Sequence, residues 1–272
     1  MKKSIHNIHT FLALALLAAG AVSCSEETEI TERADVTFTA TIPVEARTRS
    51  FGEGTEVNTL TVGVFDGENS RELHRESFPV SGTEFSVSLA LAREQTYRFV
   101  FWAYDGNSGH YDVGDLTAIR MNAPTQPVTF GQAEEADAFF ATLTVTVTGN
   151  GNQSVTLKRP LAQVNVGTTG SPCQATFTAK GAPDTFHPLT ATVSGTADFT
   201  WTFDETTDET FTVDGTEYNY IAMGYLFAPA TTVMWIAAEL TLTGGETSGP
   251  YDFPQVELQA NHQSNIAGGF TE

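Results

Sequence analysis

Basic residues are scarce in this sequence. It holds 13 lysines and arginines against 33 aspartates and glutamates in 272 residues, a formal net charge of −20. Removal of residues 1–23 would take away Lys2 and Lys3, leaving 11 basic against 33 acidic residues and a net charge of −22. Nucleic acids and anionic lipid headgroups are bound by clustered lysines and arginines, so this acidity argues against both as partners.

Cysteine is also rare, with Cys24 and Cys173 as its two copies. If Cys24 carries lipid, Cys173 has no partner within the chain, so no disulfide framework stabilises the exported protein. Neither C-x-x-C nor H-E-x-x-H occurs, which disfavours zinc. We therefore expect no metal and no cofactor, and a fold stabilised by the burial of apolar side chains.

Signatures of nucleophilic or metal-dependent catalysis are missing as well. There is no G-x-S-x-G motif. Each histidine beyond residue 23 is a single surface or loop residue in its local sequence pattern. These are His74, His110, His187 and His262. Glycoside hydrolysis needs only two opposed carboxylates, but most acidic residues lie in turn-like runs such as 204–209, where solvation explains them. We predict no catalytic residue; a hydrolase with an open two-carboxylate cleft is a minority alternative.

Residues 105–109 (DGNSG) begin like a calcium-binding loop. An EF-hand would have glycine and glutamate where His110 and Leu116 stand, so that motif fails. An irregular calcium site at Asp105, Asn107 and Asp112 is one alternative. A turn-forming Asp-Gly-Asn cluster is the favoured interpretation.

The N-terminus has the pattern of a lipoprotein signal peptide, residues 1–23. Lys2 and Lys3 precede an apolar run at 11–22, which is too short to span a bilayer. Small residues, including Ser23, come directly before Cys24, so we predict cleavage between Ser23 and Cys24 and acylation of Cys24, for example by palmitate. Two or more acyl chains give lasting membrane attachment. An ordinary secretory signal is the alternative.

Residues 24–34 form an acidic tether. The run SEETE at 25–29 is similar to the signal that sends lipoproteins of the Bacteroidota to the outer face of the outer membrane. A solvated acidic spacer is the alternative interpretation. Both are compatible with a lipid-anchored, surface-exposed protein of the cell outer membrane.

Beyond the tether, apolar residues alternate with polar ones nearly everywhere, as in strands with one buried face. Turn signals recur about every ten residues, which favours an all-β protein of two tandem antiparallel sandwiches, 35–149 and 150–272. The run GNGN at 149–152 is the predicted hinge. Strands are expected at 36–42, 60–66, 85–89, 97–104, 143–147, 155–166, 175–179, 189–193, 199–203, 211–213, 218–227, 233–242 and 256–260.

Two segments depart from this alternation. Residues 134–140 are predicted to form a single short helix. Residues 106–127 have no clear period, and we interpret them as a surface excursion with a short strand at 116–121; a functional loop is the alternative.

Four stretches make the chain similar to the fimbrillin-like surface lipoproteins of the Bacteroidota. The first combines the strand V-x-F-x-A at 36–40, the residues RTRS at 47–50 and a strand ending in V-F-D at 64–66. The others are ADAFF at 136–140, LKRPLAQV at 157–164 and NHQSNIAG at 261–268. Together they span nearly the whole exported chain.

This resemblance implies two transthyretin-like sandwiches and a role as a fimbrial tip, shaft, accessory or anchor subunit, or as a stand-alone surface protein. Polymerising members lose their first strand to an arginine-specific protease and accept a strand from a neighbouring subunit. Arg47 and Arg49 stand where such a cut would fall; two arginines without function in a turn are the alternative. No long extension follows residue 266, so 256–260 would have to be donated, or the protein is a terminal or anchor subunit.

A carbohydrate-binding surface lipoprotein of a glycan-uptake system is the alternative function, with surface glycans or host proteins as partners. Trp102, Trp201, Trp235 and Tyr111 are its candidate stacking residues, although Trp201, between two phenylalanines at 199 and 203, is expected in the core. Lys158 and Arg159 are adjacent cations in an acidic chain. We expect them to pair with carboxylates at the domain interface, as a structural feature.

Overall fold

Strands make up most of the chain that the structure describes, so the predicted all-β class is confirmed. The computed structural model describes residues 32–43, 54–68, 70–243 and 248–270, all within the compact unit Glu32–Glu272. Within these ranges the α-helix is α1 (Phe130–Glu134). No helix among them is long and apolar enough to cross a membrane.

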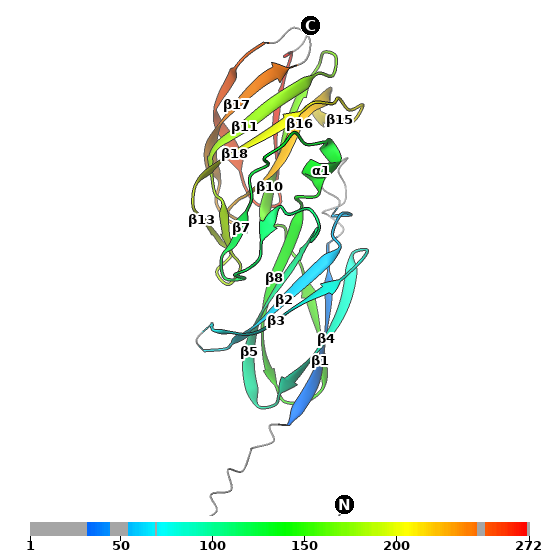
Figure 1. The fold of residues 1–272 in the computed structure, drawn as a ribbon, viewed down its shortest axis with the longest axis vertical. Helices are drawn as coiled ribbons and strands as arrows, with labels where there is room; N and C mark the ends of the chain where they lie inside the picture. Colours follow the sequence, from blue (N-terminus) through cyan, green and yellow to red (C-terminus); the bar gives the residue numbers. More distant parts are fainter. Residues whose placement is uncertain (1–31, 44–53, 69, 244–247, 271–272) are drawn as a thin grey trace, which may run out of the picture. The chain divides into compact units, whose positions relative to one another are not determined.

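The first pair of sheets encloses an apolar core. Its sheets have the strand orders β4-β1-β9 and β3-β2-β5-β8. All of these strands except β9 are labelled in Figure 1. Phe38 of β1 packs against Phe99 and Phe101 of β5, with ring centroids 4.6 and 5.3 Å away. The strands are β1 (Arg33–Thr41), β2 (Thr59–Asp66), β3 (Glu72–Pro79), β4 (Glu84–Ala92), β5 (Gln95–Tyr104), β8 (Ala138–Val147) and β9 (Gly151–Thr156).

The second pair of sheets has the orders β15-β16-β10-β19 and β14-β11-β17-β18. Trp201 of β14 lies over Gly224 of β16, where an added Cβ would come within 2.6 Å of the indole ring, so this glycine permits the close approach of the two sheets. The strands are β10 (Leu161–Thr168), β11 (Gln174–Ala182), β14 (Ala197–Phe203), β15 (Thr210–Val213), β16 (Thr216–Phe227), β17 (Met234–Thr243), β18 (Tyr251–Leu258) and β19 (Gln263–Gly268).

The two sheet pairs share one topology. β1 and β10 each pair antiparallel with one neighbour, β4 or β16, and parallel with the last strand of the pair, β9 or β19. The facing sheets are also paired in the same way. In them β3, β2, β5 and β8 correspond in that order to β14, β11, β17 and β18. Among these strands, β15 has no counterpart in the first pair. The correspondence allows one sheet pair to serve as an internal comparison for the other.

A small four-stranded sheet, β13-β12-β7-β6, draws on both halves of the chain. β6 (Tyr111–Asp112) and β7 (Ile119–Met121) lie in the predicted 106–127 excursion, and its short strand is confirmed at β7. β12 (Thr185–His187) and β13 (Thr192–Ser194) come from between β11 and β14.

Three local predictions were wrong. The strand expected at 155–166 is interrupted at residues 157–160, between β9 and β10. The helix expected at 134–140 is α1 at Phe130–Glu134, because Thr129 and Gln132 form a capping box that starts it earlier. Residues from 138 onward already belong to β8. The strand expected at 189–193 begins only at Thr192, as β13, because residues 188–191 form a turn in which Ala191 has a φ of 52°.

Strand β9 bears on the predicted boundary between residues 149 and 150. Although it follows the predicted hinge, it pairs with β1 of the first sheet pair, from Val36↔Gly151 to Thr41↔Thr156. Judged by strand pairing, the chain crosses from the first sheet pair to the second between β9 and β10. The division into domains at 35–149 and 150–272 stays a prediction.

Candidate functional site

Strand β1 is the first strand of the described chain, yet it lies in the middle of its sheet. It pairs antiparallel with β4 along its whole length and parallel with β9 from Val36 to Thr41. A central strand has its backbone groups engaged on both sides, so its withdrawal would leave unpaired groups on two neighbours.

The inward face of β1 is fully buried. Val36, Phe38 and Ala40 are at most 2% exposed, and Ile42, directly after the strand, is also buried and donates its N–H to the carbonyl of Thr83 (2.8 Å). Burial of a side chain as large as Val or Phe stabilises a fold by roughly 1.5–3 kcal/mol. Strand β1 therefore fills an apolar slot of several side chains.

The outward face of β1 carries hydroxyl side chains. Thr37 bonds Ser88 across the β1–β4 pair at 2.8 Å, and Thr39 bonds Ser86 at 3.3 Å. These cross-strand pairs fix the register but contribute little stability, because they are exposed to water. The strand is held mainly by its buried face and its backbone pairing.

A buried ion pair lies where the chain leaves the first sheet pair. Arg159 donates from Nε and Nη2 to the two carboxylate oxygens of Asp137, at 2.6 and 2.7 Å, and both side chains are 1% exposed. Its Nη1 donates to Oδ1 of Asn261 at 3.2 Å, and its guanidinium carbon lies 4.9 Å from the ring centre of Phe139. The expectation that Arg159 pairs with a carboxylate is confirmed, whereas the side chain of Lys158 is exposed.

This cluster joins three of the stretches that carry the family resemblance. Asp137 and Phe139 come from ADAFF, Arg159 from LKRPLAQV and Asn261 from NHQSNIAG. Backbone bonds between Phe140 and Lys158, 2.8 Å in each direction, hold the first two stretches together. The stretches therefore converge on one structural junction.

Burial sets the ionisation of the groups at this junction. Burial raises the pKa of the Tyr111 and Tyr225 hydroxyls well above the ordinary value, and the charge of Asp137 adds to the effect. For Arg159, burial alone would lower the pKa, but the charge and hydrogen bonds of Asp137 raise it above its usual value. Both tyrosines donate as neutral phenols, Tyr111 to the carbonyl of Ala136 and Tyr225 to Glu134 Oε1 (2.8 Å).

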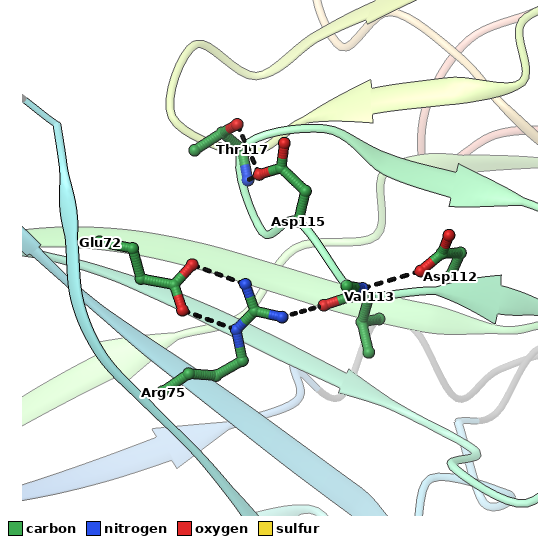
Figure 2. A network of polar contacts seen from close by, with 7 residues as sticks. Glu72, Arg75, Asp112, Val113, Asp115 and Thr117 are labelled. Atoms are coloured by element: carbon green, nitrogen blue, oxygen red, sulfur yellow. Dashed lines mark hydrogen bonds and ion pairs between the residues drawn. The ribbon is translucent and has the colours of Figure 1, made fainter.

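A second ion pair connects β3 with the segment that holds β6 and β7. Figure 2 shows Arg75 bonded through Nε and Nη2 to both oxygens of Glu72, at 2.8 and 2.6 Å, and through Nη1 to the carbonyl of Val113 at 2.5 Å. Asp115 accepts from the N–H and hydroxyl of Thr117, at 2.8 and 2.7 Å, and shapes the next turn. The pair is about a quarter exposed, so it orients the segment more than it stabilises the fold.

The other predicted site residues fall outside the described ranges. Ser23 and Cys24, predicted for cleavage and lipidation, lie in residues 1–31, and Arg47 and Arg49 lie in residues 44–53. Their roles stay predictions. Cys173 is half-buried and forms no disulfide, and burial raises the pKa of its thiol.

The residues considered for calcium form a turn. Asp105 accepts hydrogen bonds from the backbone N–H of Asn107 (2.9 Å) and from the side-chain amide of Asn58, so its carboxylate shapes the segment after β5. Across the described ranges, no group of three or more His, Cys, Asp or Glu side chains is placed to hold a metal ion. The turn shaped by Asp105 agrees with the turn-forming interpretation favoured on the sequence.

The candidate sugar-stacking residues separate by exposure. Trp102 and Tyr111 are 0% and 7% exposed, so the suggestion that these two stack on a ligand is wrong. Trp201 is 3% exposed, which confirms its expected place in the core. Trp102 is covered by Tyr111, Phe186 and other rings from distant parts of the chain. Trp235 on β17 is 57% exposed and borders a cleft between β18 and β19.

Comparison with solved structures finds this fold in proteins of Bacteroides. A proposed polysaccharide-binding protein from Bacteroides thetaiotaomicron superposes with a TM-score of 0.52 at 13% identity, covering 81% of this chain and 80% of that one. A proposed adhesin from Bacteroides ovatus gives 0.52 at 14% identity, with coverages of 85% and 79%. Another from B. thetaiotaomicron gives 0.50 at 17%, with coverages of 82% and 80%. The β-sandwich fold expected from the resemblance is thereby confirmed.

Among curated proteins, none matches this sequence. The profile of a family described as "Family of unknown function (DUF6562)" matches residues 27–271, which include every strand described above. The chain therefore belongs to the family of unknown function DUF6562.

Proposed function

We propose that the protein is a fimbrillin-like surface lipoprotein that acts in cell adhesion or fimbrium assembly, with β1 as its exchangeable strand. The observation that carries the proposal is the position of β1, central between β4 and β9 with its alternate side chains buried. Withdrawal of such a strand opens an apolar slot with unpaired backbone on both sides, which is what strand addition requires. The likeness in fold to proposed Bacteroides adhesins supports the same class of function.

Attachment to the outer membrane would depend on Cys24. Acyl chains on Cys24, followed by the acidic tether, would hold the folded part at the outside of the cell. Metabolic labelling with a palmitate analogue should mark the wild-type protein and not a Cys24→Ala variant. Protease added to intact cells should degrade the wild-type protein; complete protection in intact cells, lost on lysis, would place it in the periplasm and contradict surface display.

Assembly would begin with cleavage after Arg47 or Arg49, which separates β1 from the rest of the chain. If the protein polymerises, unboiled samples should show a ladder of high-mass species that an Arg47→Ala/Arg49→Ala variant lacks. A variant without residues 36–42 should also change the ladder, because the slot is then empty from the start. A ladder that is unchanged in both variants contradicts strand exchange, whereas the absence of a ladder in every form assigns the protein an anchor or stand-alone role.

We propose a binding role rather than a catalytic one. Each of four surface pockets in the described chain is bordered by at most one carboxylate, Glu135 or Glu257, so none has the pair that glycoside hydrolysis needs. Carbohydrate binding at the cell surface is the second candidate function, favoured by the exposure of Trp235. Other fimbrial subunits, surface glycans and host proteins are the proposed classes of partner.

A further inference from the structure

A cleft opens between β18 and β19, the edge strands of the two sheets in the second pair. It measures about 540 Å³, within the range of roughly 300–1,000 Å³ typical of small-molecule sites. We call it the β18–β19 cleft and define it by Trp235, Gln255, Glu257, Gln259, His262 and Gln263.

The pairing of β17 with β18 aims Trp235 outward. Trp235 lies opposite Glu257, whereas the neighbouring pair Ile236↔Val256 faces the core with both side chains at most 5% exposed. Side chains of directly paired residues share a face, so the indole and the Glu257 carboxylate lie together on the outer surface. The indole is 57% exposed despite its large apolar area.

A β-bulge shapes the cleft. The register shifts between Ile236↔Val256 and Ala238↔Phe253, so Pro254 and Gln255 stand opposite the single residue Ala237. Proline cannot donate to a sheet ladder, and bulges on edge strands bend the strand and redirect side chains. Gln255 is exposed as a result. The hydroxyl of Ser264 on β19 donates to the carbonyl of Glu257 on β18, and both residues line the cleft.

The first sheet pair shows that the fold does not require this lining. The equivalent groove, between β8 and β9, measures about 320 Å³ and is bordered mainly by Ala, Thr, Ser, Leu and Val side chains. Its aromatic residue, Phe140, is 7% exposed and belongs to the core. An exposed indole surrounded by amides is therefore particular to the second pair.

We infer that the β18–β19 cleft binds a neutral glycan, with one sugar ring stacked on Trp235 and its hydroxyls bonded by the surrounding amides. The indole offers a flat apolar face to the C–H groups of a pyranose. Gln255, Gln259 and Gln263 each carry both donors and acceptors, which suits hydroxyl groups that also do both. Nε2 of Gln259 already donates to the carbonyl of Ala230 (3.4 Å) and Nε2 of Gln263 to Oε1 of Gln163 (3.0 Å), so each of these two offers a ligand its oxygen and its second N–H. No lysine or arginine borders the cleft, and the chain carries a net charge of −20, so acidic or sulfated glycans are repelled.

A protein partner fits this cleft less well. Protein interfaces are centred on contiguous buried apolar or aromatic anchors, whereas most side chains around Trp235 are amides and other polar groups. This inference deepens the carbohydrate-binding candidate, and it involves neither β1 nor cleavage at Arg47 or Arg49.

The three tryptophans make a direct test practical. Trp102 and Trp201 are buried, so quenching of fluorescence by acrylamide in the full chain reports Trp235. The full chain, purified in a detergent without a sugar headgroup, is titrated with a panel of neutral gluco-, manno-, xylo- and galacto-oligosaccharides and with uronic-acid and sulfated counterparts. We expect at least one neutral oligosaccharide to protect Trp235 from the quencher, with no such protection by the acidic counterparts.

Variants locate the binding. Isothermal titration with the same oligosaccharide should show at least about tenfold weaker binding for Trp235→Ala, with a smaller loss for Trp235→Phe. Val233→Ala, at another exposed apolar residue next to β17, is the matched control and should bind as wild type. Arg47→Ala/Arg49→Ala should bind normally, so failure of strand exchange and failure of glycan binding are distinguishable. Any one of four results would overturn the inference: no binding by any neutral oligosaccharide, equal binding of acidic ones, binding confined to proteins, or full binding by Trp235→Ala.

Discussion

Arg159 and Asp137 form a bidentate ion pair in which each side chain is 1% exposed. The two residues are 22 positions apart and stand on either side of β9 in the sequence, so their contact holds β8 and the start of β10 in place. Asn261, next to β19, bonds the same guanidinium. One cation thus connects the segments that precede β8, β10 and β19.

Removal of one partner should be far more harmful than removal of both. We expect Asp137→Ala to lower the free energy of unfolding by about 3–5 kcal/mol, because it leaves a buried cation without its counter-charge. The double variant Asp137→Leu/Arg159→Met should recover much of this loss, since well-packed apolar residues can replace a buried pair. Urea unfolding measures both; a loss below about 1 kcal/mol for Asp137→Ala would contradict the structural role of the pair.

The two faces of β1 should respond differently to substitution. Phe38→Ala removes a fully buried ring that packs on Phe99 and Phe101, and we expect a loss of about 3–5 kcal/mol in the free energy of unfolding. Thr39→Ala, on the outer face of the same strand, should lose less than about 1 kcal/mol. Equal losses in chemical denaturation would show that β1 is not held by its buried face.

Gly224 should tolerate no side chain. An added Cβ would come within 2.6 Å of the Trp201 ring, and overpacking of this kind typically destabilises by about 1–3 kcal/mol. Thermal unfolding of Gly224→Ala should show this loss. Gly151→Ala is the control, because nothing lies within 4 Å of its Cβ position; it should be neutral or gain up to about 1 kcal/mol. A neutral Gly224→Ala would mean that the two sheets are further apart than described.

His110 should make stability fall as the pH is lowered. Burial lowers the pKa of its imidazole below 6.5, against the opposing effect of the hydrogen bond to the Gln132 carbonyl, so the folded chain takes up the proton less readily than the unfolded chain. Stability is therefore lost as the pH falls from about 6.5 to the lower folded-state pKa, and the loss is complete below it. Urea unfolding of His110→Gln across this window should show a weaker pH dependence than the wild type; identical slopes would contradict this.

The alternating pattern predicted most strands because it reflects local geometry. In β1, β2, β5 and β17 the buried positions recur every second residue or fill both faces, and the sequence carries that pattern directly. Strand β3 was missed because its sequence, ELHRESFP, is charged on both faces of an exposed edge. Strand β19 was missed because its residues, QSNIAG, are mostly amides and small residues that are half-buried or exposed and have no apolar period.

Long-range contacts explain the remaining differences. The sequence suggested that Arg159 would pair with an acid, but only the fold identifies Asp137 and adds Asn261 and Phe139. Trp102 is buried because rings from β6, β12 and β16 cover it, and no local pattern reports such coverage. The outward position of Trp235 follows from the sequence pattern, since Ile236, Ala238 and Leu240 occupy the alternate, inward-facing positions of the same strand.

Uptake of a β1 peptide tests the exchange of β1 most directly. The purified full chain is cut with an arginine-specific protease and incubated with a fluorescent peptide of residues 33–43 (RADVTFTATIP). The cut chain should bind this peptide stably enough to migrate with it on an unboiled gel, and it should reject a peptide carrying Phe38→Ala. The uncut Arg47→Ala/Arg49→Ala chain should bind neither peptide. Failure of the cut chain to bind the wild-type peptide, or equal uptake of both peptides, would contradict β1 as an exchangeable strand.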